Sequence, residues 1–457
     1  MSYMAFPPPR PLRNAFAEAN ASSADGRDHI GEVIDPEASS NPSSEPLPPA
    51  KEFACHLVHN KSKKAWATLS VLGDTVQSKG SPAILQDTPI SGEVRLDLGS
   101  GESIHSIILL LRGQVITGAT PSEMFTFFEL PTTLWTRSMG DPRNPSVSDR
   151  PTKWGEKLKG AYTWPFSVTL PATVTLPVGR REEVFPLPQT FFERHTRARI
   201  KYELSVRFQR TGLRTDHRLS TTLNYLPVSR PGPASRLRQL SYQQHTALLG
   251  PDADPEGWHA FPVVKTRGRL PGCPSTEVKC TLILAKPLCY TRGTSIPCAL
   301  VVECYHPPTL QRLADPASVP LRLRRSVRFH AGEKTSSQNA DDYDNDLAWK
   351  EETEFSELAT WWPAADRSME FDSTETLLAD PPRRLLRGEL HLRPDLIVSS
   401  SMAHYRIEYA VVLFPFDAPG FESSDNGPLF NEVIEIASDF ADGPRPLQYT
   451  EPFATVI

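Results

Sequence analysis

The stretch that decides the fold runs from residue 197 to residue 210 and reads Arg-Ala-Arg-Ile-Lys-Tyr-Glu-Leu-Ser-Val-Arg-Phe-Gln-Arg. Apolar and polar residues alternate through it, which is the period of a β-strand with one buried and one exposed face. Such half-buried strands are typical of antiparallel sheets that cover a core on one side. The apolar set comprises Ala198, Ile200, Tyr202, Leu204, Val206 and Phe208.

The same pattern occurs a second time near the end of the sequence. The segment 405–413 reads Tyr-Arg-Ile-Glu-Tyr-Ala-Val-Val-Leu, so Ile407 and Tyr409 correspond to Ile200 and Tyr202 at an offset of 207 residues. A repeat over such a distance predicts two domains that share one architecture.

Length and composition agree with two β-rich domains. The chain has 457 residues, which is too long for a single core of ordinary size. Its 45 prolines favour short strands and loops over long helices. The formal net charge is −5, so no global basic field points to a nucleic-acid partner.

The periodicity predicts an all-β fold of two tandem β-sandwiches, with less than about a tenth of the residues helical. Residues 1–50 contain nine prolines and almost no paired apolar residues, so this segment is expected to be a disordered tail. We expect the first sandwich at 51–230, a linker at 231–270 with a short helix within 236–249, the second sandwich at 271–440, and a tail at 441–457.

A set of spaced residues around the first strand carries a family resemblance. Together with a Gly-x-Val-x-Leu segment at 92–96 and a Tyr-Thr-Arg-Gly segment at 290–293, this set resembles the arrestin superfamily, and the alpha-arrestins in particular. Thr190 stands where that family often has serine. The resemblance covers roughly residues 55 to 438 and implies arrestin-like, immunoglobulin-type sandwiches. The matching residues are Gly160, Tyr162, Trp164, Phe166, Leu170, Pro171, Leu187, Pro188, Phe191, Tyr202, Leu204 and Val206.

The resemblance implies a non-catalytic adaptor in membrane-protein trafficking, which would act in endocytosis, sorting or ubiquitination of cargo. Its implied partners are membrane-protein cargo tails, a ubiquitin ligase and, at the periphery, anionic membrane. Alpha-arrestins recruit ligases through Pro-Pro-x-Tyr, but the double prolines here, such as Pro307-Pro308 and Pro381-Pro382, are not followed by that tyrosine.

The sequence shows neither an apolar span of about 20 residues nor a secretory signal. We therefore expect a cytoplasmic protein that acts in part at the plasma membrane or endosomes. The six cysteines are too few for a disulfide scaffold, so reduced thiols are expected, with Cys280, Cys298 and Cys304 on apolar strand faces.

No motif of a known catalytic or cofactor site occurs in the sequence, so we predict no catalytic residues, no cofactor and no metal. Cys55, His56 and His59 form the one close Cys/His cluster, and they lack the second ligand pair that zinc requires. The competing class is a β-sandwich enzyme or small-ligand-binding protein. Such a protein would show a deep pocket with converging polar groups.

An acidic run between residues 341 and 357 is expected to be a solvated loop, because like charges in a block repel one another and extend the chain. Lys350 is the single cation in it. The acids are Asp341, Asp342, Asp344, Asp346, Glu351, Glu352, Glu354 and Glu357.

The exposed face of the first strand supplies the candidate binding residues, which are Arg197, Arg199, Lys201 and Arg207. Two interpretations stay open. The face is either an ordinary solvated surface that Glu203 partly neutralises, or a surface that binds phosphorylated cargo tails or acidic lipid. The second interpretation rests on the planar arginine fork, which grips phosphate through two parallel hydrogen bonds, and on the spacing of about 7 Å between alternate strand residues.

Overall fold

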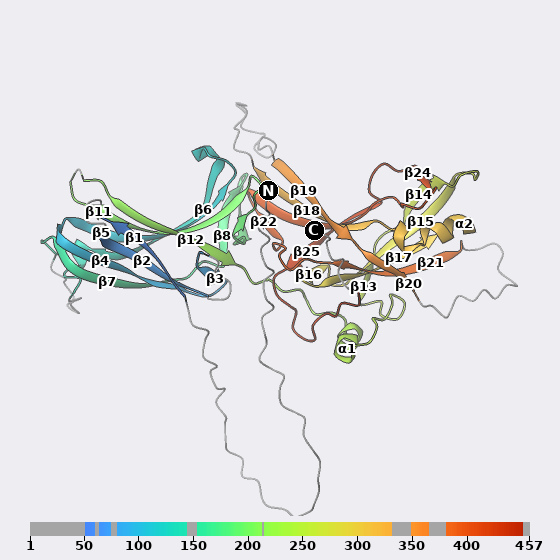
Figure 1. Ribbon diagram of the computed structural model, residues 1–457, viewed down its shortest axis with the longest axis horizontal. Coiled ribbons are helices and arrows are strands. Elements are labelled where there is room, and N and C mark those ends of the chain that lie inside the picture. Colours follow the sequence, from blue (N-terminus) through green and yellow to red (C-terminus); the bar gives the residue numbers. More distant parts are fainter. Residues whose placement is uncertain are drawn as a thin grey trace, which may run out of the picture.

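The computed structural model shows an elongated molecule built from two β-sandwiches that follow one another along the chain (Figure 1). This confirms the predicted all-β fold. The predicted tail at 1–50 lies outside the residues that the structure describes, which are 51–59, 64–74, 80–143, 153–212, 214–330, 349–364 and 381–450.

The first sandwich is formed by strands β1 to β12. One sheet has the order β1-β2-β4-β7, the other has the order β3-β12-β11-β5-β6 with β10 beside β11, and β8 pairs with β9 in a separate ribbon. The bounds are β1 Lys51–Val58, β2 Ala65–Gly73, β3 Ala83–Leu85, β4 Ile90–Glu102, β5 Ile104–Ile116, β6 Met124–Thr136, β7 Leu158–Val168, β8 Thr173–Val178, β9 Arg181–Pro186, β10 Phe191–Phe192, β11 Arg199–Arg210 and β12 His217–Leu226.

The second sandwich is formed by strands β13 to β25. One sheet has the order β20-β21-β17-β15-β14-β24 with β13 beside β15, and the other has the order β16-β25-β23-β18-β19 with β22 beside β23. The bounds are β13 Trp258–Ala260, β14 Val264–Arg269, β15 Thr276–Ala285, β16 Cys289–Thr291, β17 Ser295–Glu303, β18 Leu321–His330, β19 Trp349–Leu358, β20 Thr360–Pro363, β21 Arg383–His391, β22 Ser400–Met402, β23 Tyr405–Leu413, β24 Glu422–Ser423 and β25 Phe430–Ala437.

The two halves repeat one topology. Strand β11 lies between β5 and β12, as β23 lies between β18 and β25. The short strand β3 pairs in parallel with β12, and the short strand β16 pairs in parallel with β25. Tyr202 and Tyr409, the pair singled out by the sequence repeat, are both fully buried. Their hydroxyls donate to the carbonyls of Pro188 and Ile397 at 2.6 Å and 2.7 Å. The repeat in sequence is therefore a repeat in hydrogen bonding as well.

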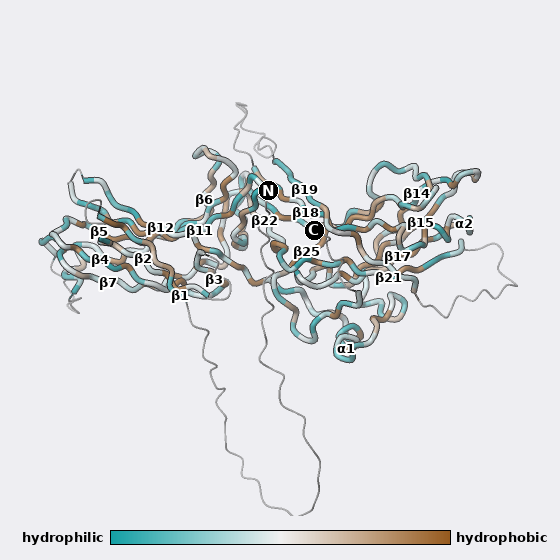
Figure 2. The backbone as a smooth tube through the Cα atoms, viewed as in Figure 1, coloured by the Kyte–Doolittle hydropathy of each residue, from teal (hydrophilic) through white to brown (hydrophobic). Residues whose placement is uncertain are grey.

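The cores lie between the two sheets of each sandwich, and alternate residues of the central strands fill them. Along β11 the even-numbered residues from Ile200 to Phe208 are at most 1% exposed. Apolar stretches follow strands such as β5 and β17 in Figure 2, whereas polar stretches follow the loops. Burial of these side chains supplies the main favourable term of folding.

Two glycines allow large aromatic side chains to lie against a neighbouring strand. A Cβ at Gly113 on β5 would come within 2.4 Å of the Phe127 ring, and a Cβ at Gly388 on β21 would come within 2.6 Å of the Trp361 ring. Glycine is required at these positions by packing, since neither position has a positive φ.

The prediction of a linker at 231–270 is partly wrong. Its helix is present as α1, Arg236–Gln244, because the Ser235 hydroxyl caps the first turn by accepting from the Arg238 amide at 3.2 Å. However, β13 and β14 fall inside the predicted linker and pair with β15. The second sandwich therefore begins near Trp258, earlier than the predicted residue 271. These two strands are short, and this explains why the sequence pattern did not reveal them. A further short helix, α2, spans Pro307–Leu313.

The prediction that the acidic run is a solvated loop is also partly wrong. Residues 341–348 lie outside the described part, but Trp349–Leu358 form β19, which pairs with β18. The acids are tolerated in a strand because arginines lie on the neighbouring strand. Arg325 is the register partner of Glu354 and Arg328 that of Glu351.

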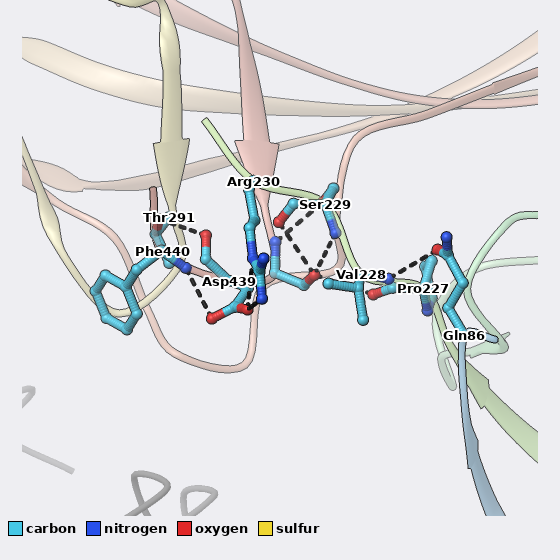
Figure 3. Close-up of polar contacts among 9 residues, drawn as sticks. Gln86, Pro227, Val228, Ser229, Arg230, Thr291, Asp439 and Phe440 are labelled. Atoms are coloured by element: carbon cyan, nitrogen blue, oxygen red, sulfur yellow. Dashed lines mark hydrogen bonds and ion pairs between the residues drawn. The ribbon is translucent and has the colours of Figure 1, made fainter. Parts of the chain in front are cut away.

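A polar junction joins the end of the first sandwich to the end of the second (Figure 3). Ser229 and Ser438 exchange hydrogen bonds between the amide of each and the hydroxyl of the other, at 2.9 Å and 3.1 Å. Arg230 forms an ion pair with Asp439 at 2.8 Å. Val228 donates its amide to Gln86 in the first sandwich at 3.0 Å. These contacts hold the segment that leaves the first sandwich against the end of the second sandwich.

The cysteines are free thiols, as expected from the sequence. Cys280, Cys298 and Cys304 are buried, and burial raises the pKa of each thiol, to about 12 for Cys280. Thiols with raised pKa values are poor nucleophiles, because the thiolate is the reactive form.

Candidate anion-binding face and interdomain cleft

The candidate residues lie on the outer face of the sheet that contains β11. The inward residues of β11 fill the core, so the residues between them point away from it. Neighbouring strands add Arg112 from β5 and Arg218 from β12, which lie opposite Glu203 and Arg207 in the register. The face is therefore rich in arginine, and the acids within it decide how much positive charge is available.

Arg197 and Arg199 are the most available cations of the four. Arg197 precedes β11 and is 57% exposed in its side chain, with its guanidinium 4.0 Å from Glu123. That carboxylate is already held by Thr120, whose amide and hydroxyl donate to it at 3.0 Å and 2.7 Å. The exposed Arg199 guanidinium lies 4.8 Å from the centre of the Phe192 ring. Both guanidinium groups can thus accept an anionic partner.

Lys201 is largely neutralised within the sheet. Its Nζ lies 2.5 Å from the Glu203 carboxylate, and Arg218 pairs with the other oxygen of that carboxylate. The Glu203 side chain is 14% exposed, so the carboxylate that pairs with both cations is largely shielded from solvent. This local triad matches the solvated-face interpretation for Lys201.

Arg207 is paired as well. Its guanidinium contacts Asp216 at 2.7 Å, and the Arg210 amide donates to the same carboxylate at 3.0 Å. The Arg210 amide, together with the Arg207 guanidinium, lowers the pKa of Asp216. Asp216 therefore stays ionised and keeps Arg207 paired.

The structure brings three of the four candidates together and separates the fourth. Arg197, Arg199 and Lys201 lie at the N-terminal end of β11, whereas Arg207 lies eight residues beyond Arg199 in the same strand. At the rise of a β-strand this is about 26 Å. We define the N-terminal trio as the basic trio.

Arg197 and Arg199 of the basic trio lie at one edge of a cleft between the two sandwiches, because Arg199 packs on Phe192 and the Arg197 amide contacts Glu352, which both line the cleft. The cleft has a volume of about 590 Å³ and is lined from the first sandwich by Glu193, Arg194 and His195. The second sandwich lines it with Arg325, Glu352 and Glu354. The Arg197 amide donates to Glu352 at 3.4 Å, which links the trio directly to this cleft.

A charged latch crosses the cleft. Arg325 on β18 donates through both terminal nitrogens to the two oxygens of Glu193, at 2.6 Å and 2.7 Å, and contacts Glu354 at 2.7 Å. Burial alone would lower the pKa of the Arg325 guanidinium, but the hydrogen bond and charge of Glu193 more than offset this and raise it. We call Arg325, Glu193 and Glu354 the interdomain latch. Sequence reasoning missed it because Arg325 and Glu193 are 132 residues apart.

The remaining Cys/His cluster shows no metal-binding arrangement. Cys55 and His56 lie on β1, where the His56 ring contacts the Thr68 hydroxyl at 2.9 Å. Within the described ranges, no group of three or more His, Cys, Asp or Glu side chains is placed to hold a metal ion.

No protein-family model matches this sequence, and no curated protein is detectably similar to it. Among the residues that the structure describes, no helix is long and apolar enough to cross a membrane. The arrangement of the site therefore rests on its own geometry, which presents two available arginines beside a charged interdomain cleft.

Proposed function

We propose that this chain is a non-catalytic, arrestin-like adaptor that binds the acidic or phosphorylated tails of membrane-protein cargo through the basic trio. The observation that carries the proposal is the exposure of the Arg197 and Arg199 guanidinium groups at the edge of the interdomain cleft. A ligand carboxylate or phosphate there gains charge-assisted hydrogen bonds, which are stronger than neutral ones.

The direction of β11 suits an extended ligand. Arg199 and Lys201 point to the same side of the strand at a spacing of about 7 Å, which is also the spacing of alternate residues in an extended peptide. A peptide with acidic groups at alternate positions can therefore meet Arg199 directly and Lys201 in competition with Glu203. In this proposal the adaptor works in the cytoplasm, at the plasma membrane or endosomes, and brings cargo to a ubiquitin ligase by a contact other than Pro-Pro-x-Tyr.

The test is simultaneous charge reversal of Arg197, Arg199 and Lys201 to glutamate. We expect binding of a phosphoserine peptide with acidic alternate positions, measured by fluorescence anisotropy at low salt, to weaken by about tenfold or more, since each lost charge-assisted hydrogen bond is worth about 1.5–3 kcal/mol. Wild-type binding should also weaken as salt is raised above about 0.1 M, where the Debye length falls below about 10 Å.

A matched control exists on the second sandwich. Lys265, Arg267 and Arg269 on β14 have the same alternate spacing, and they pair with the acids Glu277 and Glu422, as Lys201 and Arg197 pair with Glu203 and Glu123. Reversal of these three to glutamate changes the net charge equally and should leave peptide binding intact. Unchanged binding in a folded Arg197/Arg199/Lys201 variant, or an equal loss in the control, would contradict the proposal. Vesicles of anionic lipid, used as a second probe, show whether membrane or peptide is the preferred anion.

A further inference from the structure

A buried carboxylate on the second sandwich is held by a segment from the far end of the described chain. Glu389 on β21 is 1% exposed. The amides of Tyr449 and Thr450 donate to it at 3.1 Å and 3.0 Å, and the Thr450 hydroxyl donates at 2.8 Å. Within the described residues no lysine or arginine forms an ion pair with it. A buried carboxylate is costly without such donors, so the two residues and Glu389 stabilise each other.

Beyond Glu389, the segment that supplies these donors is held by a few side-chain contacts, one of which joins His391 Nε2 to the Thr450 hydroxyl at 2.9 Å. Arg230 holds Asp439 through an ion pair. Among the described residues, the backbone of residues 441–447, which lie between Asp439 and Gln448, forms no hydrogen bond. Gln448 adds one side-chain hydrogen bond to Gly293 at 3.4 Å, and the Tyr449 hydroxyl donates to Thr246 at 2.8 Å. We call residues 448–450 the strap.

A cavity of about 440 Å³ lies beside the strap. Its apolar walls come from Leu248, Trp258, Trp361 and Trp362, and Tyr449 and Thr450 close one side of it. Cavities with aromatic walls and a few polar groups are the usual form of ligand sites, and a side chain of a bound peptide can fill such a cavity in the same way.

The strap leaves polar atoms around Glu389 without partners. Thr360 Oγ1, Arg387 Nε and His391 Nδ1 are buried and have no hydrogen-bond partner among the described residues. Thr360 lies directly opposite Glu389 on β20, and Arg387 and His391 flank it along β21. Buried polar groups are ordinarily paired, so these atoms indicate that the site can make more hydrogen bonds than the strap satisfies.

We propose that the outer face of β21 at Glu389 is a docking site for an extended peptide, and that the strap occupies this site in the free protein. The partner is a peptide in which an aromatic residue is followed by serine or threonine. Its two successive amides and its hydroxyl bind Glu389, and a neighbouring side chain enters the tryptophan-lined cavity. Recognition through backbone amides fixes the extended conformation, while the hydroxyl and the cavity select the sequence.

The test uses the full-length chain and a labelled synthetic peptide with the sequence of residues 444–451 as the probe. Thr450→Glu places a second carboxylate against Glu389 and releases the strap. We expect this variant to bind the peptide at least about tenfold more tightly than wild type, because a tethered competitor acts at an effective concentration in the millimolar range. Adding Glu389→Gln to the Thr450→Glu variant should abolish the tighter binding of the peptide. Ser424→Glu, which adds the same charge at an exposed loop, should bind like wild type.

A measurement on the unmodified protein guards against misfolded variants. Hydrogen exchange at the Tyr449 and Thr450 amides should be slow in the free protein and faster with excess peptide, because the peptide displaces the strap from Glu389. The proposal is overturned if Thr450→Glu binds no better than wild type, if binding survives Glu389→Gln, or if excess peptide leaves the exchange of these amides unchanged.

Discussion

Replacing Tyr202 by alanine is expected to lower the free energy of unfolding by about 3–5 kcal/mol, the range for deletion of a large buried aromatic side chain. Tyr202 is fully buried, its ring packs against Phe127 and Tyr225, and its hydroxyl is bonded to Pro188. Urea denaturation followed by tryptophan fluorescence measures the loss. Tyr202→Phe keeps the ring and leaves the Pro188 carbonyl without that partner, so it should cost about 1–3 kcal/mol.

Tyr409→Ala should cost a similar amount, because Tyr409 has the same burial and the same kind of hydrogen bond in the second sandwich. The matched control is Tyr305→Ala, since Tyr305 is 68% exposed and its loss should change stability by less than about 0.5 kcal/mol. If Tyr202→Ala and Tyr305→Ala were equally mild, the assignment of Tyr202 as a central core residue would be wrong.

Replacing Arg325 by methionine is expected to cost about 2–3 kcal/mol and to uncouple the two sandwiches. The Arg325 side chain is 12% exposed, and its removal leaves Glu193 and Glu354 facing each other without their shared cation. Breaking a buried pair costs about 3–5 kcal/mol, and the partial exposure of both carboxylates reduces this figure. Calorimetry should show one melting transition in wild type and two separated transitions in the variant.

The control for the latch is Arg269→Met, which removes an arginine that pairs with Glu422 at 2.7 Å within the second sandwich. Both side chains are about two-thirds exposed, so the change should cost less than about 1 kcal/mol. Exchanging the charges of Arg325 and Glu193 in one chain should recover part of the lost coupling. A single melting transition at the wild-type temperature in Arg325→Met would show that the latch does not hold the sandwiches together.

The repeated sandwich was predictable because its signal is local. The alternation of apolar and polar residues along β11 and β23 indicates which residues face the core, and the offset between Tyr202 and Tyr409 indicates the duplication. The end of the linker was missed since β13 and β14 have three and six residues, too few for a clear period.

The contacts between distant segments were not predictable from the same signal. Alternation does not say which strand of one sandwich meets which strand of the other, so the pairing of Arg325 with Glu193 was hidden. The acidic residues of β19 were misread for a related reason. Their arginine partners on β18 lie in another strand, and a window of sequence shows a charge run without its counter-ions.

Part of the candidate site was also predictable. The exposure of Arg197, Arg199 and Arg207 follows from the strand period, and the structure agrees with it. The ion pairs of Lys201 and Arg207 depend on Glu203 and Asp216, whose side-chain directions are set by the folded sheet and its turn. The sequence therefore predicted the positions of the cations but not which of them are already neutralised.

The most direct test of the proposed adaptor function is photocross-linking from the middle of the outer face of the sheet that contains β11. Ser220 on β12 is exposed and lies opposite Ser205, between the two ends of β11, so a photoreactive side chain there reaches a peptide bound along the strand. We predict cross-linking to the phosphoserine peptide from position 220, none from position 424 on the second sandwich, and loss of the product when Arg197, Arg199 and Lys201 are changed to glutamate. Equal cross-linking from both positions, or a product that persists in the charge-reversed variant, would contradict the account.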